Sequence, residues 1–267
     1  MRTSVVVCTY NAPRELDLVL CGLSRQTRPP DEVLIADDGS TDDTAQLVAS
    51  WQDNVSFPLV HVWHEDRGFR KARVSNEAVR RSKGDHLVFL DGDSIPHRKW
   101  MEDHVGAADD DRILCGRRVK LGPRLTSGLA RSDVEQGRLE AFFGPVLKST
   151  LAGDTARFVL GIRLPVFLAR LFHPRARKLM GVNFSLPRRR FEAVNGYDED
   201  LARRLDWDLE LRLRRSDFLF YPLLNRAVVY HLHHEPAGPT NLDGRLEASV
   251  RTRCEHGLDS GGFDEES

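Results

Sequence analysis

The chain has 267 residues, of which 40% are hydrophobic and 8% are aromatic, as expected for one large globular domain or two small ones. Its 39 basic and 40 acidic residues give a formal net charge of −1, which argues against non-specific binding to nucleic acid. No apolar run is long enough for a signal peptide or for a membrane span of roughly 18 residues, so we expect a cytoplasmic protein. The four cysteines form no CxxC pair and are expected to be free thiols.

The first half of the chain alternates strand and helix patterns. Apolar runs predict strands at residues 4–8, 33–36, 59–63 and 86–90, and helical spacing between them predicts helices after Pro13, after Thr41 and from about Phe69 to Ser82. Such repeats predict an α/β fold with a mostly parallel, Rossmann-like central sheet flanked by helices. Ligands of these sheets bind at the carboxyl ends of the strands. All four predicted strands end in polar turns (TYN, DDGS, HEDRG and DGD), which predicts the position of the site.

The fourth of these turns is Asp91-Gly92-Asp93. Two carboxylates one residue apart at a strand end can hold a divalent cation together with the diphosphate that the cation neutralises. An isolated triplet of this kind is more often only a turn. Its position directly after the fourth strand of a βα series favours the metal site.

A histidine cluster, His231-Leu232-His233-His234, follows a strand-like run. Histidine is a common ligand of Mn²⁺ or Zn²⁺ and is less suited to Mg²⁺. A lone histidine after a strand is usually structural, but three in four residues favour one metal ligand. We predict His231 as that ligand, with His234 as the second choice and His233 facing away.

A third candidate is the acidic helix pattern from Leu205 to Leu213, in which Asp206 and Glu210 share one face and Asp208 points elsewhere. An acidic residue in the first turn of a helix is often only a cap. It can also be the base that deprotonates an attacking hydroxyl.

The fourth candidate is the charged stretch from Glu65 to Arg73, where cations at a helix start are able to meet phosphates. We assign Arg70 to the site. Lys71 and Arg73 are interpreted as part of a solvated helix face.

The middle of the chain is strongly basic, in contrast to the balanced charge of the whole chain. Residues 155–191 contain nine cations and no acidic residue, around a broken apolar run from Phe158 to Phe172. This pattern fits either a core helix with a basic face or a platform for an anionic, lipid-linked acceptor at the inner membrane surface. From Pro236 onward the chain is rich in Gly, Asp, Glu and Ser, and we expect this tail to be partly disordered.

With these residues in view, the chain resembles glycosyltransferase family 2 of the GT-A fold over residues 3–235. The GFR…N and HLxH elements are similar to bacterial chondroitin-polymerase domains and to lipopolysaccharide or capsule transferases. Seven segments match in the order of the family: VVVCTYNAP, PDEVLIADDGSTDDT, EDRGFRKARVSNEA, GDHLVFLDGDSIP, GVNFSLPRRRFEAVNGYDED, DWDLELRLRR and VVYHLHHEP.

The resemblance implies a single GT-A domain over residues 1–235, with residues 1–115 as the nucleotide-sugar half and residues 116–235 as the acceptor half carrying the basic and apolar insert 155–180. It implies metal-dependent, inverting transfer of a sugar from a nucleotide-sugar, with a UDP-sugar expected, to a glycan or lipid-linked acceptor, with Mn²⁺ or Mg²⁺ as the cofactor. The implied roles are Thr9, Tyr10 and Asn11 at the nucleotide, Asp38 at the base, Arg70 at the donor, Asp91 at the ribose or sugar, Asp93 and His231 at the metal, and Asp206 as the general base.

Two positions depart from the family pattern. Leu205 stands where relatives usually have Glu before the catalytic Asp, and Ser75 stands where they often have Arg before the residue that is here Asn76. Three other functions compete with sugar transfer. A sugar nucleotidyltransferase would need a Gly-rich basic loop after the first strand, and a nicotinamide-dependent oxidoreductase would need GxGxxG there. The residues at that place are TYNAP, which fit neither. A non-catalytic nucleotide-sugar-binding protein is the alternative that Leu205 leaves open.

Overall fold

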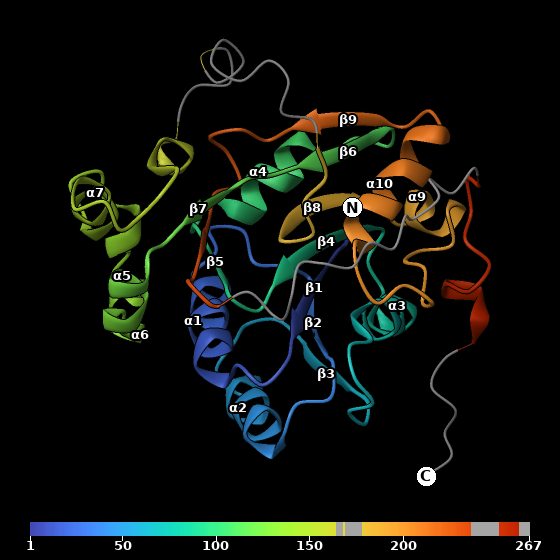
Figure 1. The fold of residues 1–267 in the computed structure, drawn as a ribbon, viewed down its shortest axis with the longest axis horizontal. Helices are drawn as coiled ribbons and strands as arrows, with labels where there is room; N and C mark the ends of the chain where they lie inside the picture. The colour runs from blue at the N-terminus through green and yellow to red at the C-terminus, as the bar shows by residue number, and fades with distance from the viewer. Residues whose placement is uncertain (164–167, 169–177, 236–250, 262–267) are drawn as a thin grey trace.

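A computed structural model describes residues 1–163, 168, 178–235 and 251–261 of the chain. Its centre is a seven-stranded sheet (Figure 1). The strands in spatial order are β3 (Leu59–Trp63), β2 (Glu32–Asp37), β1 (Thr3–Thr9), β4 (His86–Asp91), β8 (Asn183–Pro187), β6 (Arg112–Cys115) and β9 (Leu219–Pro222).

The sheet is mixed but mostly parallel. The first four strands in this order pair in parallel, as do β6 and β9. Strand β8 is antiparallel to both of its neighbours, β4 and β6. The predicted α/β class and the four N-terminal strands are therefore confirmed, and the antiparallel strand comes from a part of the chain where no strand was expected.

Each central strand is buried on both faces. On β1, Val5 and Val7 join one hydrophobic core while Val6 joins the other. This arrangement explains why the strands are continuous apolar runs without polar alternation. One core lies under α1 (Pro13–Ser24), α2 (Asp42–Gln52) and α4 (Trp100–Ala107), and the other under α3 (Lys71–Arg81), α9 (Arg188–Ala193) and α10 (Leu205–Arg215) (Figure 1).

A second, three-stranded sheet forms beside the DGD turn. It has the order β5 (Ser94–Pro96), β10 (Val229–His231) and β7 (Arg118–Lys120). Because β5 begins immediately after Asp93 and pairs with β10, the distant His231 lies opposite Ser94. Between β7 and β8 the chain forms α5 (Pro123–Gly128), α6 (Arg131–Glu135), η1 (Arg138–Glu140), α7 (Pro145–Leu151) and η2 (Phe158–Gly161).

The basic stretch 155–191 is only partly described. Its apolar run begins as the short 3-10 turn η2, and Arg170, Arg175 and Arg177 lie outside the described residues. Four of its arginines already have protein partners: Arg163 binds Asp103, Arg188 donates to the carbonyl oxygen of Gly84, Arg189 pairs with Asp110 and Arg190 pairs with Asp111. Fewer of its cations are therefore free to meet an anionic surface than the sequence suggests.

Part of the expected tail packs against the body of the molecule. Residues 251–261 include the turn η3 (Leu258–Ser260), and the side chain of Asn195 donates to the carbonyl oxygen of Cys254 at 3.0 Å. Arg80 of α3 donates to the carbonyl oxygen of Leu258 at 2.9 Å. The composition of this stretch predicted partial disorder because it did not reveal these long-range contacts.

None of the helices in the described ranges has the length and apolar character needed to cross a membrane. All four cysteines are free thiols, as expected, and three of them are buried.

Candidate functional site

The DGD turn meets the end of strand β1. The backbone N–H of Gly92 donates to the carbonyl oxygen of Cys8 at 2.7 Å. A Cβ atom at position 92 would lie 2.9 Å from that oxygen and 3.0 Å from the Cβ atom of Thr9. Glycine between the two aspartates therefore allows the carboxyl ends of β1 and β4 to come together, and Thr9 and Asp91 lie at the same sheet edge.

Asp93 lies among three polar side chains. One oxygen of its carboxylate is 3.0 Å from Nδ1 of His231, and the other is 3.3 Å from Nε2 of His234. The hydroxyl group of Ser94 contacts both Asp93 and His231, at 3.0 and 3.1 Å. Burial opposes ionisation of Asp93, but the hydrogen bond from His231 and the nearby histidine charges hold its pKa below the usual value.

Asp93, His231 and His234 can each offer one ligand atom, and these atoms lie within 4.8 Å of one another. His233 takes no part in this cluster, and its backbone N–H donates to Thr126 instead. The structure thus brings together the two residues predicted as metal ligands and the second-choice histidine.

Lys71 belongs to the site, and its interpretation as part of a solvated helix face was wrong. Its ammonium group lies 2.6 Å from Asp91, and only 26% of its side chain is exposed. Burial alone would lower the pKa of Lys71, but the carboxylates of Asp91 and Asp206 raise it, so the lysine is charged. Several cations lie close together at the start of this helix. The sequence does not show which of them faces the site, because a shift of one residue along the helix changes the direction of the side chain.

Asp206 lies at the start of α10, close enough to Lys71 and Asp91 for their charges to act on it. Its carboxylate accepts a hydrogen bond from the backbone N–H of Gly181 at 2.9 Å. Burial raises the pKa of Asp206 and the charge of Asp91 raises it further, while Lys71, Gly181 and Arg118 act in the opposite direction. The result is a half-buried carboxylate with a raised pKa, a property suited to a base that works near neutral pH.

The other carboxylates of α10 have different partners. Asp208 forms a buried ion pair with Arg212 at 2.6 Å. Glu210 accepts the backbone N–H of Leu179 at 3.1 Å and pairs with Arg214. Asp206 and Glu210 therefore share the face that binds residues 179–181, as their spacing predicted. Leu205 is packed in the hydrophobic core beneath α10, so its side chain does not line the site.

The loops expected to hold the nucleotide are tied to one another. The backbone N–H of Asn11 donates to Ser40 at 2.8 Å, and the side chain of Asn11 accepts the N–H of Thr41 at 3.0 Å. Tyr10 is half exposed and donates to Asp66 at 2.9 Å. The TYN turn thus lies beside the turn that follows β2.

Asp38 holds the next loop in place. Its carboxylate is 2.8 Å from Nε2 of His64 and accepts the backbone N–H of Arg70 at 3.0 and 3.1 Å. The guanidinium group of Arg70 donates to the carbonyl oxygen of Glu65, and its Nε atom is buried without a hydrogen-bond partner. Lys71, and not Arg70, is the cation that pairs with the DGD turn.

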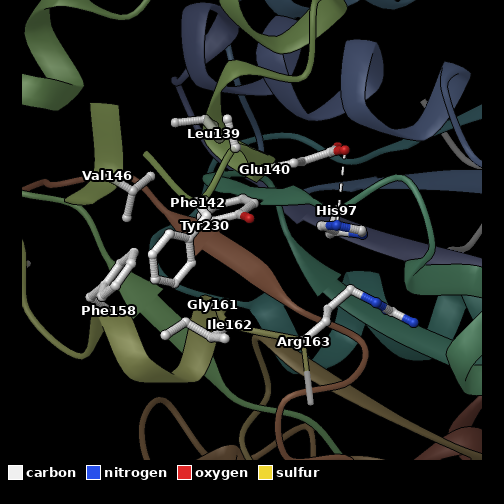
Figure 2. Close-up of a pocket in the computed structure, with 11 residues that line it drawn as sticks. His97, Leu139, Glu140, Phe142, Val146, Phe158, Gly161, Ile162, Arg163 and Tyr230 are labelled. Carbon is white, nitrogen blue, oxygen red and sulfur yellow. Dashed lines mark ion pairs between the residues drawn. The ribbon is translucent and has the colours of Figure 1, made fainter. Parts of the chain in front are cut away.

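A separate cavity of about 220 Å³ lies between η1, η2 and β10 (Figure 2). Tyr230 and Phe142 line it, together with His97, whose imidazole is 3.9 Å from Glu140. None of the predicted site residues lines this cavity. The candidate site is therefore the sheet edge around Asp91, Asp93 and Asp206, and not this cavity.

Comparisons with known proteins identify the family. The model of glycosyl transferase family 2 matches residues 4–164, which is more than half of the chain and includes the TYN, DDGS and DGD turns. The chain belongs to glycosyltransferase family 2. It is 33% identical over 222 residues to a validoxylamine A glucosyltransferase of Streptomyces hygroscopicus subsp. limoneus, an alignment that covers 79% of this chain and 47% of that protein.

This family 2 member also matches part of a much longer protein. It is 30% identical over 254 residues to the chondroitin synthase of Pasteurella multocida, covering 91% of this chain and 26% of that protein. The chain thus spans about half of the glucosyltransferase and about a quarter of the synthase.

Solved structures show the same fold. Staphylococcus aureus TarS aligns with a TM-score of 0.58 at 18% identity, covering 87% of this chain and 37% of that one. The mannosyltransferase PcManGT from Pyrobaculum calidifontis, in complex with GDP-Man and Mn²⁺, aligns with a TM-score of 0.56 at 21% identity, covering 88% of this chain and 57% of that one. At these identities the match supports the GT-A-like fold alone.

Sequence analysis missed three residues that the structure places in the site. Lys71 was assigned to solvent, and Arg118 and Gly181 were not considered. The nitrogen Nη1 of Arg118 lies 3.2 Å from Nε2 of His231. Arg118 lies on the three-residue strand β7, which pairs with a segment more than 100 residues away, and no local pattern predicts such a pairing.

Proposed function

We propose that this family 2 member transfers a hexosyl group from a nucleoside-diphosphate sugar, with UDP as the nucleotide, to a hydroxyl group of a glycan or lipid-linked acceptor with inversion of configuration. The observation that carries the proposal is the convergence at one sheet edge of a candidate cation cluster at Asp93 and a half-buried carboxylate at Asp206, with the Lys71–Asp91 ion pair beside them. A binding site alone has no need of a base with a raised pKa.

The residues present fit a divalent cation. One carboxylate and two imidazole groups form a mixed oxygen and nitrogen set, which suits Mn²⁺ better than Mg²⁺. The lowered pKa of Asp93 keeps this carboxylate ionised. We infer that Asp93 and His231 hold the cation, with His234 as a further ligand. When bound, the cation would neutralise the charge of the nucleoside diphosphate.

The protein groups supply the rest of the reaction. Gly181 holds one oxygen of Asp206, which orients the carboxylate so that the other can accept the proton of the acceptor hydroxyl. The hydroxyl oxygen then attacks the anomeric carbon as the bond to the diphosphate oxygen breaks. Asp91, fixed by Lys71, is assigned to the sugar or ribose, and Thr9, Tyr10, Asn11, Asp38 and Arg70 are assigned to the nucleotide. Two solved structures of similar fold hold UDP-GlcNAc or GDP-Man with Mn²⁺.

The first experiment needs no acceptor. Purified protein is incubated with UDP-, GDP- and dTDP-sugars in Mn²⁺, and slow hydrolysis is followed by release of the nucleoside diphosphate. We expect one nucleotide to be preferred and the hydrolysis to need the metal. Asp93→Ala should lose Mn²⁺-dependent donor binding and keep a melting temperature near the parental value, because Asp93 is half-buried at the sheet edge and belongs to neither hydrophobic core.

Two results would contradict the proposal. Unchanged Mn²⁺-dependent affinity in Asp93→Ala would remove the metal assignment. Tight donor binding with neither hydrolysis nor transfer to any glycan acceptor would instead favour a binding protein, the alternative suggested by Leu205 in place of the usual carboxylate.

A further inference from the structure

Arg118 lies between the two halves of the candidate site. Its Nη1 atom lies 3.2 Å from Nε2 of His231, on the opposite side of that ring from Asp93. Its charge also acts on Asp206, whose pKa it lowers. The guanidinium group is thus next to the candidate cation cluster and within electrostatic reach of the candidate base.

The charge of Arg118 is poorly compensated. Across residues 1–163, 168, 178–235 and 251–261, no carboxylate lies within ion-pair distance of it, and its contact at His231 is with a ring nitrogen. Its Nε atom is buried and has no hydrogen-bond partner. A partly buried guanidinium group with an unused donor gains most from an anion that accepts two parallel hydrogen bonds, and phosphate oxygens have this geometry.

We propose that Arg118 is a diphosphate-binding residue of this site, which holds the terminal phosphate of the nucleoside diphosphate from the side opposite to Asp93. The inference rests on the proposed function, because that function supplies the diphosphate. Arg118 then stabilises the negative charge that develops on the leaving phosphate when the sugar bond breaks. A phosphate or carboxylate on the acceptor would offer similar chemistry, and the experiment separates the two sources.

The test compares Arg118→Gln with Lys120→Gln. Lys120 is two residues along the same strand, on the same side of the sheet, and exposed, so both variants lose one positive charge. Binding is measured by calorimetry with Mn²⁺ alone, and then in Mn²⁺ with UDP, UMP and uridine (GDP, GMP and guanosine if the parent prefers GDP). We expect Arg118→Gln to weaken UDP binding by about 10- to 100-fold, the effect of losing a charge-assisted pair, and to change UMP and uridine binding little. Lys120→Gln should stay within about twofold of the parent.

The remaining outcomes are distinguishable. Mn²⁺ alone should bind Arg118→Gln at least as tightly as the parent, because a cation beside a ligand nitrogen has been removed; weaker Mn²⁺ binding would make Arg118 a support for His231 and overturn the proposal. Parental UDP affinity with a raised acceptor KM would assign the anion to the acceptor and overturn it too. A parent protein that binds no nucleoside diphosphate would overturn the proposed function itself.

Discussion

At the scale of single residues, two aspartates on the short helix α10 have different surroundings and different roles. Asp206 is half-buried near Lys71 and Asp91, and no arginine pairs with it directly among the described residues. Asp208, two positions later, forms an ion pair with Arg212, which is only 1% exposed. One carboxylate is thus available for proton transfer, and the other holds the helix in place.

This difference predicts opposite results for the same substitution. Asp206→Asn should lower turnover by about 10²- to 10⁴-fold, with donor affinity and melting temperature near parental values, because only the basic oxygen is lost. Asp208→Asn should destabilise the fold by about 3 kcal/mol or more, because it leaves a buried arginine without its counter-charge. Transfer assays and thermal melts of both variants check the prediction. Parental turnover in Asp206→Asn would move the base to another carboxylate.

Lys71 carries a second prediction at this scale. Its charge lowers the pKa of Asp206, so in Lys71→Met that pKa rises and the carboxylate stays protonated to a higher pH. The acid limb of the kcat profile should therefore move to higher pH, and Lys71→Arg should largely restore it. A kcat profile measured through the neutral range tests this. An equal loss of activity at every pH, with no shift of the limb, would mean that Lys71 acts only by positioning Asp91.

At the scale of elements, residues 178–182 connect α10 to the sheet edge. The backbone N–H groups of Leu179 and Gly181 donate to Glu210 and Asp206, which are one helical turn apart. Arg117, the residue before β7, binds the same stretch by donating to the carbonyl oxygen of Lys178 at 2.8 Å. The position of the candidate base is thus set by helix α10 together with residues 178–182 and the residue that leads into β7.

Gly181→Ala tests this connection. A Cβ atom there would lie 2.3 and 2.5 Å from the two carboxylate oxygens of Asp206, so the loop or the aspartate must move. We expect turnover to fall about tenfold or more and stability to fall by about 1–3 kcal/mol. Gly106→Ala is the matched control, since nothing lies within 4 Å of its added methyl group. Parental kinetics in Gly181→Ala would show that the position of Asp206 does not depend on this loop.

Some of these elements could be predicted from the sequence and others could not. The four N-terminal strands and the polar turns after them were predictable, because each is a local apolar run followed by a local turn. Strand β8 and the sheet that joins β7 to β10 were not, since both depend on pairing between distant segments. Asp93 and His231 were expected together because each follows a predicted strand and because of the family resemblance. Lys71 and Arg70 are adjacent cations at the start of α3, and the sequence does not show which of them faces the site.

At the scale of the whole molecule, a buried histidine network joins the large sheet to α4. His86 and His104 both contact the hydroxyl group of Ser185, at 2.9 and 2.8 Å, and His104 also contacts Asn183 at 3.0 Å. Burial lowers the pKa of His86 to about 3 and that of His104 to about 4, from 6.5. Both rings are therefore neutral in the folded protein.

These shifts predict a fold that is sensitive to acid. Because the folded-state pKa values are depressed, the unfolded chain binds more protons below pH 6.5, and stability is lost as pH falls from about 6.5 towards 4. Melting temperatures measured across this window should fall steadily. His104→Gln should reduce the slope of that fall even if it lowers stability overall, while replacement of the exposed His233 by Gln should leave the slope unchanged. A flat profile in the parent would contradict the prediction.

The position of β8 limits where recombination between related genes can occur without dividing the large sheet. This strand, from residues 183–187, lies between β4 and β6, which come from residues before 116, so a recombination point at residue 115 would divide the large sheet between two parents. Residues 121–163, the part of the segment after β7 that the structure describes without a gap, contribute no strand to that sheet. Lineages can therefore exchange these residues while keeping both the sheet and residues 178–182, and residues 121–163 are where we expect members of the family to diverge in the acceptors they use.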